Sequence, residues 1–487
     1  MRQASLPLEN LRTWAHFNDV RLFEASIEPR IIGEDGIEKG GGLQADAEHG
    51  PGKPFVAVPL DLVLSKERVE QCAKADQHLK GLIEAAPSLF KTPRTAVLLF
   101  LVYQMTINSP DCQGQGHGLG VSNPFADYVK MLPHDILLPT FYTSEERDLL
   151  SGTSLSDALE QKLISLEREF DSLQAFTAEI PWCQKIWWDD RTGCLSVEDW
   201  KLADAMYRSR ALELPRGAGL GMVPVVDMAN HASDDRYNAR FEVDEETQSV
   251  LLVARDNSTV KQGDEVTIMY GCGGACEMIF SYGFLEEHAS SAREMFLGLS
   301  IPTDDPLRVA KIRFAQEAPG VRIYVDDSDQ VHWESTFVWW ACVNQEDGLD
   351  FRVERTLDGN MELQALWKDE ELNAAALQST LENDRLRDVF LLRAVVMIQE
   401  RVEQQGTKLA TSEDDFQNTL VGNQVRVPVY QTVGRLRTLE IELLARAYEM
   451  LDTEKANLLE SSVVRTYLGI GQPPTTESTG IAPEDFS

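Results

Sequence analysis

Three short segments carry side chains that could act together in a binding or catalytic site. Residues 223–231 end in an asparagine–histidine pair, residues 266–271 contain Tyr270, and residues 281–284 read Ser-Tyr-Gly-Phe. An asparagine amide both donates and accepts hydrogen bonds, a histidine ring titrates near neutral pH, and a tyrosine offers a phenol hydroxyl. Such groups can hold a polar ligand or orient a reacting atom if the fold brings the segments together.

Each of these residues also has an ordinary structural explanation when it is considered alone. A histidine such as His231 is more often a satisfied core residue than a ligand, and Tyr270 is a common type of strand residue. Arg210 alone would be a surface ion-pair residue, and the glycine run at 40–42 would be a loop. The functional interpretation therefore depends on the segments occurring together and in this order.

The elements that must position these residues change character along the chain. Residues 39–45 predict a glycine-rich turn, and residues 54–59 predict a short strand bounded by prolines. Ser65 is typical of a helix N-cap, and helical patterns then continue to about residue 200, as in the apolar spacing of residues 97–105. Strand patterns return between residues 251 and 270.

The second half of the chain is predicted to be mainly helical. After a short mixed stretch that follows residue 290, apolar stripes at 386–397 and 436–451 indicate two core-facing helices. Residues 471–487 are rich in Pro, Thr, Ser and Gly and predict a disordered tail. The longest apolar run, residues 95–107, is too short to span a bilayer, and the N-terminus has no apolar signal-peptide core.

Composition predicts an ordinary soluble protein of two or three structural units. The chain has 487 residues, of which 43% are hydrophobic and 25% charged. Its seven cysteines are scattered, which is typical of reduced thiols in a cytosolic or nuclear protein. Cys272 and Cys276 are four residues apart with no second pair after them, so no metal site is predicted.

The chain is strongly acidic, with 45 Lys and Arg against 79 Asp and Glu, for a net charge of −34. Such a surface repels nucleic-acid phosphates and attracts basic proteins. Solubility alone would also explain the charge. We therefore expect no direct contact with DNA or RNA, and the charge gives weak support to a basic protein partner.

Together and in this order, the three segments resemble the signature segments that build the active site of SET-domain methyltransferases. The resemblance covers nearly the whole chain and points to the Rubisco-lysine-methyltransferase-like branch of that family. Its other parts are residues 14–20, 40–43, 122–133, 139–150 and 200–211 and, by helix pattern alone, about 292–455.

The resemblance implies an α+β fold. Residues 1–290 would form the SET domain, a β-clip core of short strands with a helical insert at about 67–200. Residues 291–460 would form a mainly α-helical C-terminal substrate-binding domain.

The resemblance also implies a site for S-adenosylmethionine and a channel for a lysine side chain. Tyr270 would be the catalytic residue, and Tyr282 and Phe284 would bind the substrate. The implied cofactor-binding residues are Gly40, Gly41, Gly42, Leu43, Ser209, Arg210, Asp227, Asn230, His231 and Tyr270. In this arrangement Arg210 offers a planar fork to the cofactor's carboxylate.

The implied activity is protein-lysine N-methylation of a basic protein, such as a ribosomal protein or a histone. Two alternatives remain open: a non-catalytic protein-binding module on the SET scaffold, and a methyltransferase that modifies histidine or a small molecule. Lys39 stands where the branch often has an acidic residue, and Gly41 where a larger apolar residue is usual, which motivates the first alternative. Val226 replaces the tryptophan of the histidine-modifying members, which favours lysine.

Overall fold

The computed structural model describes residues 1–32, 38–112, 118–217, 219–233, 236–271, 273–286, 288–315, 318–355, 361–419 and 425–470. The chain divides into two compact units. The first comprises Met1–Ser144, Asp157–Gly273 and Glu277–His288, and the second comprises Glu145–Ser156, Gly274–Cys276 and the chain from Ala289 onward. The predicted tail at 471–487 and Cys272 lie outside the described residues.

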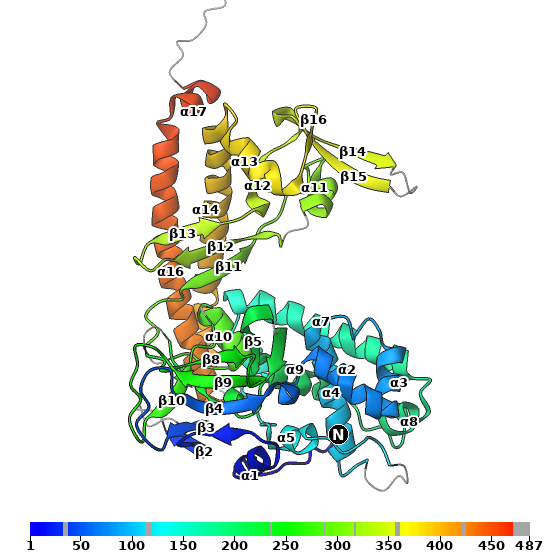
Figure 1. The fold of residues 1–487 in the computed structure, drawn as a ribbon. Helices are drawn as coiled ribbons and strands as arrows, with labels where there is room; N and C mark the ends of the chain where they lie inside the picture. The colour runs from blue at the N-terminus through cyan, green and yellow to red at the C-terminus, as the bar shows by residue number, and fades with distance from the viewer. Residues whose placement is uncertain are drawn as a thin grey trace, which may run out of the picture. The chain divides into compact units, whose positions relative to one another are not determined.

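Two four-stranded sheets and one hairpin form the β part of the first unit. One sheet has the order β2-β3-β10-β7 and the other β1-β4-β9-β8, while β5 pairs with β6. In Figure 1 the blue strand β3 lies between β2 and the green β10, although β3 and β10 are more than two hundred residues apart in sequence. The strands are β1 Arg21–Leu22, β2 Ala25–Ile32, β3 Glu38–Ala45, β4 Pro54–Pro59, β5 Ala211–Leu214, β6 Gly219–Met222, β7 Asn230–His231, β8 Ala239–Asp244, β9 Ser249–Ala254 and β10 Glu265–Ile268.

Helices dominate the stretch between β4 and β5, as the sequence predicts. Ser65 is the N-cap of α2, and its side chain accepts a hydrogen bond from the backbone N–H of Arg68. The helix predicted around residues 97–105 is α4, which is buried on nearly all sides. The α-helices between residues 1 and 288 are α1 Asn10–Phe17, α2 Lys66–Ala75, α3 Gln77–Ala85, α4 Pro93–Asn108, α5 Phe125–Met131, α6 Ser144–Asp148, α7 Ser154–Thr177, α8 Pro181–Cys183, α9 Val197–Arg208 and α10 Ala275–Tyr282.

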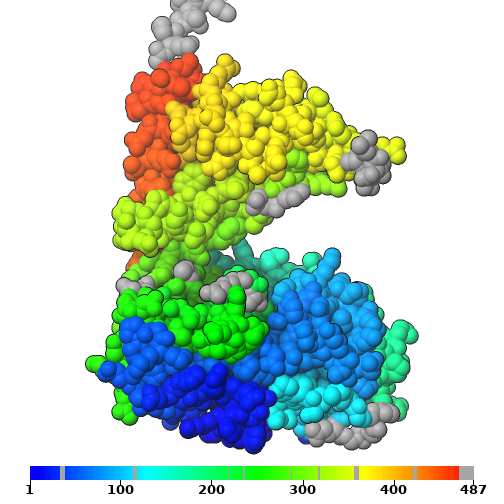
Figure 2. Space-filling view, viewed as in Figure 1, coloured from blue at the N-terminus to red at the C-terminus, as the bar shows by residue number. Residues whose placement is uncertain are grey.

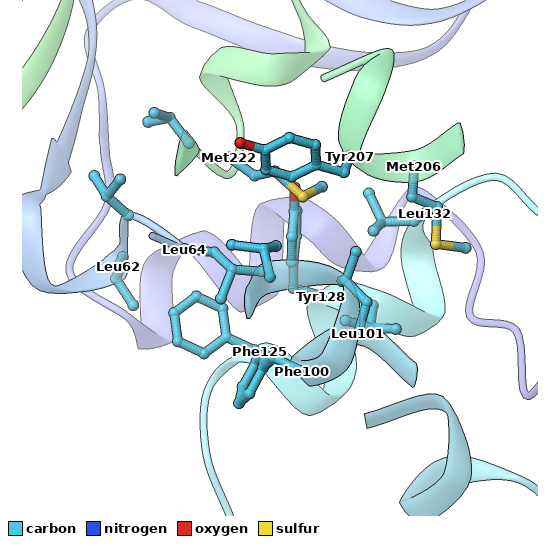
Figure 3. Close-up of a cluster of buried hydrophobic side chains, with 14 of the residues drawn as sticks. Leu62, Leu64, Phe100, Leu101, Phe125, Tyr128, Leu132, Met206, Tyr207 and Met222 are labelled. Carbon is cyan, nitrogen blue, oxygen red and sulfur yellow. The ribbon is translucent and has the colours of Figure 1, made fainter. Parts of the chain in front are cut away.

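One hydrophobic core joins the helical insert to the strands of the first unit. Side chains from α4, α5, α9 and β6 converge in it (Figure 3), and burial of this apolar surface is the main force that holds the unit together. The labelled members are Leu62, Leu64, Phe100, Leu101, Phe125, Tyr128, Leu132, Met206, Tyr207 and Met222. Because α9 packs here, the residues at its C-terminal end have a fixed position.

The glycine-rich segment is a strand, so the turn predicted at residues 39–45 is wrong. It forms β3, which pairs with both β2 and β10. A Cβ atom added to Gly41 would lie 2.3 Å from Leu8 Cδ2, and one added to Gly42 would lie 2.7 Å from Ile31 Cγ1. Glycine is needed at these positions because neighbouring side chains approach the backbone closely, and Gly40 in addition has a positive φ of 82°.

The second unit contains two three-stranded sheets and a set of helices. The sheets are β11-β12-β13 and β14-β15-β16, so strand structure extends to residue 372, well beyond the short mixed stretch that was predicted. In Figure 2 the yellow part of this unit lies beside its red helical end. The strands are β11 Glu294–Gly298, β12 Gly320–Val325, β13 Val331–Glu334, β14 Leu349–Arg355, β15 Met361–Trp367 and β16 Glu370–Leu372.

The two predicted apolar stripes lie on α14 and α16, which confirms both helices. Their buried residues include Val389 and Phe390 on α14 and Leu436 and Leu443 on α16. The helices of the unit are α11 Arg308–Ala315, α12 Phe337–Cys342, α13 Leu377–Glu382, α14 Arg387–Thr411, α15 Glu413–Thr419, α16 Val427–Leu459 and α17 Ser462–Tyr467. Within the described residues, no helix has the length and apolar character needed to cross a membrane.

A buried carboxylate on α16 contacts the start of α7. Glu440 accepts hydrogen bonds from the backbone N–H of Ser154 at 3.1 Å and from its hydroxyl at 2.5 Å. Burial raises the pKa of Glu440 to about 7, and Arg437 opposes that shift. This contact lies in the second unit, which includes Glu145–Ser156.

Candidate active site

The first and second signature segments meet as two parallel strands. Thr267 of β10 is paired with Asn230 of β7, and Ile268 is paired with His231. On its other edge β10 pairs with β3, where Val266 lies opposite Leu43. The central strand β10 therefore brings residues near 41, 230 and 270 together, although they are far apart in the sequence.

His231 and Tyr270 lie against one another. The backbone N–H of Tyr270 donates to His231 Nδ1 at 3.1 Å, and the two ring centroids are 5.1 Å apart. Because Nδ1 accepts, a neutral ring carries its proton on Nε2, which lies 3.8 Å from Glu286 Oε1. His231 thus has a structural role: it joins the two segments and orients Tyr270.

Three aromatic side chains gather around this junction. The ring of Tyr270 lies 4.6 Å from that of Tyr282, and the ring of Phe284 lies 6.3 Å from that of His231. The hydroxyl of Tyr270 donates to the backbone oxygen of Ala229 at 3.0 Å. Burial raises the pKa of Tyr270 above its usual value and that of Tyr282 to about 12, so both phenols are protonated at neutral pH.

The half-buried Arg210 and the buried Asp227 form an ion pair next to the aromatic group. Arg210 Nη1 donates to the backbone oxygen of Asp227 at 3.0 Å and lies 3.4 Å from its Oδ2. Tyr128 donates to the same Oδ2 at 2.6 Å. Burial raises the pKa of Asp227, while Arg210 and Tyr128 act in the opposite direction. Two buried polar atoms of the pair, Arg210 Nε and Asp227 Oδ1, have no hydrogen-bond partner among the described residues.

Asn230 connects the site to the glycine strand. Its Nδ2 donates to Glu265 Oε1 at 2.8 Å and to the backbone oxygen of Gly41 at 3.2 Å. A Cβ atom at Gly42 would lie 2.9 Å from this nitrogen. On the other side of the carboxylate, Lys39 Nζ lies 3.1 Å from Glu265 Oε2.

The remaining predicted residues are less directly involved. Ser209 ends α9 and its hydroxyl donates to the backbone oxygen of Ala205 at 2.8 Å, which leaves the side chain on its own helix. The Leu43 side chain is fully buried in the core. Gly40 has open space around its Cα. For these three positions any contribution to a ligand would come from the backbone.

Three residues of the arrangement were missed from the sequence. They are Tyr128, which contacts Asp227; Glu265, which contacts Asn230; and Glu286, which contacts the backbone N–H of Ser233 at 2.8 Å and lies near His231. Glu265 precedes the predicted strand, and Tyr128 lies in a segment, residues 122–133, that was recognised only as part of the helical insert. Only the folded arrangement relates them to the site.

Comparison with known proteins identifies relatives of this chain. No family model matches it. SET domain-containing protein 8 of Schizosaccharomyces pombe is 26% identical over 372 residues, which is 74% of this chain and 79% of that protein. The chloroplastic ribulose-1,5-bisphosphate carboxylase/oxygenase large subunit N-methyltransferase of Nicotiana tabacum is 26% identical over 317 residues, 64% of this chain and 57% of that protein.

A solved structure matches the whole fold. The SET domain of LSMT bound to lysine and AdoHcy superposes with a TM-score of 0.65 at 18% identity, over 96% of this chain and 97% of that chain. The fold is thus the SET-domain fold of Rubisco LSMT. The sequence matches add that a SET-domain protein and a Rubisco large subunit N-methyltransferase are among the relatives of this chain.

Proposed function

We propose that this chain is an S-adenosylmethionine-dependent methyltransferase that modifies a lysine of a basic protein. The observation that carries the proposal is the fixed position of Tyr270, whose hydroxyl contacts the Ala229 backbone and whose ring lies against Tyr282 and His231. Relatives named as lysine N-methyltransferases and a fold neighbour bound to lysine and AdoHcy support the same activity.

The residues next to Tyr270 fit the polar groups of S-adenosylmethionine. Arg210 Nε is a buried donor and Asp227 Oδ1 a buried acceptor, and both lack protein partners. A carboxylate and an ammonium would satisfy them. Glycine at 42 keeps side-chain atoms away from Asn230, and the backbone of residues 40–43 would border the cofactor.

When bound, S-adenosylmethionine supplies a methyl group on a positively charged sulfur. The protein's task is then to deliver a neutral lysine amine in line with it. A free lysine has a pKa of about 10.4, and desolvation against Tyr282 and Phe284 would lower that value. Fixed orientation of the two reactants would provide much of the rate enhancement.

Tyr270 would act as an orienting group and not as a base. Its pKa is raised by burial, so the phenol keeps its proton, and that proton is directed to the Ala229 carbonyl. The lone pairs of the phenol oxygen would face the reactants and accept weak hydrogen bonds from polarised C–H groups or from the amine.

The substrate and the cellular location are further parts of the proposal. The net charge of −34 favours a basic partner, with ribosomal proteins and histones as the first candidates. We propose action in the cytosol or the nucleus, where thiols stay reduced; the six described cysteines, which form no disulfide, support this location. Microscopy of the tagged protein in cells would test the location.

The decisive experiment is methyl transfer with isotopically labelled S-adenosylmethionine. Purified protein is incubated with histone and ribosomal-protein fractions, and mass spectrometry identifies the labelled residue. Labelled lysine supports the proposal, whereas labelled histidine identifies the alternative acceptor. Calorimetry in parallel separates an enzyme from a scaffold: absence of any S-adenosylmethionine binding would favour the non-catalytic module.

A further inference from the structure

Lys39, Glu265 and Asn230 form a linear chain of contacts across three strands. Lys39 on β3 contacts Glu265 Oε2 at 3.1 Å, and Glu265 on β10 accepts from Asn230 on β7 through Oε1 at 2.8 Å. Each carboxylate oxygen therefore has one partner.

The contacts determine which way the Asn230 amide faces. Its two neighbours, Glu265 Oε1 and the backbone oxygen of Gly41, are both acceptors. The NH₂ group must therefore face them, because an amide oxygen in that place would repel both. Among the described residues, no donor contacts the amide oxygen Oδ1. The side chain accordingly offers an acceptor, and not a donor, to a ligand.

We propose that Lys39 and Glu265 are a positioning pair that holds Asn230 with its acceptor toward the cofactor. The ligand group opposite Oδ1 must then be a hydrogen-bond donor, such as the ammonium or the adenine amino group of S-adenosylmethionine. This inference rests on the proposed function. It assigns Glu265 and Lys39 an indirect role through Asn230, since neither needs to touch the cofactor.

A simpler explanation is that the pair only ties β3 to β10. Lys39 is about 40% exposed at its side chain and Glu265 about 19%, and ion pairs of this exposure contribute little to stability. If the ion pair only linked the two strands, any pair of opposite charges at positions 39 and 265 would restore its effect. If the pair positions Asn230, a reversed pair would not restore the effect, because residue 265 must present a hydrogen-bond acceptor to Asn230.

The test compares Glu265→Gln with Glu265→Met by calorimetry with S-adenosylmethionine. Both variants remove the same charge and have similar size, but only glutamine retains an oxygen for Asn230. We expect affinity within about threefold of the unmodified protein for Gln and about 10- to 100-fold weaker for Met, as for loss of a hydrogen bond to a charged group. In turnover assays KM for the cofactor should rise while kcat changes little.

The charge swap Lys39→Glu with Glu265→Lys is the second test. It restores an ion pair but places a donor beside the Asn230 NH₂, so we expect unchanged thermal stability with weakened binding. The matched control is the swap of another cross-strand pair, Arg322→Glu with Glu294→Arg, between β12 and β11, which should leave binding unchanged.

The outcomes separate this inference from the proposed function. If the unmodified protein does not bind S-adenosylmethionine, both fail. If it binds and the Gln and Met variants have equal affinity, the positioning role is overturned while the proposed function stands. If the charge-swapped variant binds S-adenosylmethionine as tightly as the unmodified protein, the pair only links β3 to β10 and the positioning role is likewise overturned.

Discussion

At the scale of single residues, Tyr270 is the most informative side chain. Its hydroxyl already donates to the Ala229 carbonyl, so its orientation is fixed before a substrate binds. The acidity of this phenol is suppressed by burial. A role in orienting the reactants therefore predicts loss of turnover, and little loss of cofactor binding, when only the oxygen is removed.

Tyr270→Phe should lower kcat on the order of 100-fold, comparable to removal of one preorganised polar group from an active site. Affinity for S-adenosylmethionine should change by less than about threefold, since the ring contacts remain. Single-turnover methyl transfer and calorimetry measure the two quantities. Tyr324→Phe on β12 of the second unit is the control and should match the unmodified protein. A kcat that is unchanged in Tyr270→Phe would contradict the assigned role.

Tyr128→Phe tests the support of Asp227. The variant removes a buried 2.6 Å hydrogen bond to Oδ2, and we expect the free energy of unfolding to fall by about 2 kcal/mol. Cofactor affinity should fall as well, because Asp227 and Arg210 would lose their fixed geometry. Chemical denaturation and calorimetry provide the readouts.

Tyr103→Phe is a matched control for that experiment. Tyr103 is buried in α4 and donates to both oxygens of Asp76 at 2.9 Å, away from the site. The Tyr103→Phe variant should lose about as much free energy of unfolding as Tyr128→Phe and keep full affinity for the cofactor. Equal losses of affinity in both variants would show that the effect of Tyr128 is general destabilisation.

At the scale of elements, β3 shows why some features were not predictable. The glycine run has the local signature of a turn. It is a strand because β2 and β10 supply hydrogen bonds on both edges and because Leu8, Ile31 and Asn230 approach its backbone. Such contacts between distant segments leave no local pattern. In contrast, α2, α4, α14 and α16 follow from capping and apolar spacing, which are local properties.

The contact of α16 with the start of α7 predicts a pH dependence. The folded-state pKa of Glu440 is about 7, above its ordinary value of 4.5, so the folded protein binds the extra proton more tightly. Its contribution to stability is therefore present below pH about 4.5 and declines as the pH rises toward 7, by on the order of 3 kcal/mol. Unfolding of the second unit, followed by hydrogen exchange at pH 5 and 8, measures this decline.

Glu440→Gln should reduce the loss of stability of the second unit between pH 5 and pH 8, because glutamine does not titrate. Glu449→Gln, at an exposed position of the same helix, is the control and should retain it. If the pH dependence of Glu440→Gln equals that of the unmodified protein, Glu440 is not its source.

At the scale of the whole molecule, the net charge of −34 predicts salt-sensitive recognition of the protein substrate. Raising NaCl from about 50 mM to about 300 mM shortens the screening length, so KM for a basic protein should rise by about tenfold. The affinity for S-adenosylmethionine should change much less, because its contacts are short-range. Steady-state kinetics at several salt concentrations test this, and a constant KM would argue against charge-based recognition.

The fold class could be predicted at this scale because the resemblance extends over nearly the entire chain, and the superposition on Rubisco LSMT confirms it. The neighbourhood of His231 and Tyr270 was also predictable, since both lie in recognisable segments. Glu265, Tyr128 and Glu286 were not, because their roles depend on the pairing of strands and on buried contacts. The assigned ligand roles of the site residues stay predictions until binding is measured.

The site residues Gly41, Asn230, Tyr270 and Glu286 come from widely spaced parts of the chain. A ribosome needs on the order of 10 to 50 s to synthesise the roughly 250 residues that separate the first from the last of them. Until β10 has been synthesised, β3 can pair only with β2 and has no partner on its other edge. One edge of the glycine strand therefore stays unpaired while more than two hundred further residues are added, and the site can assemble only after its aromatic residues have left the exit tunnel.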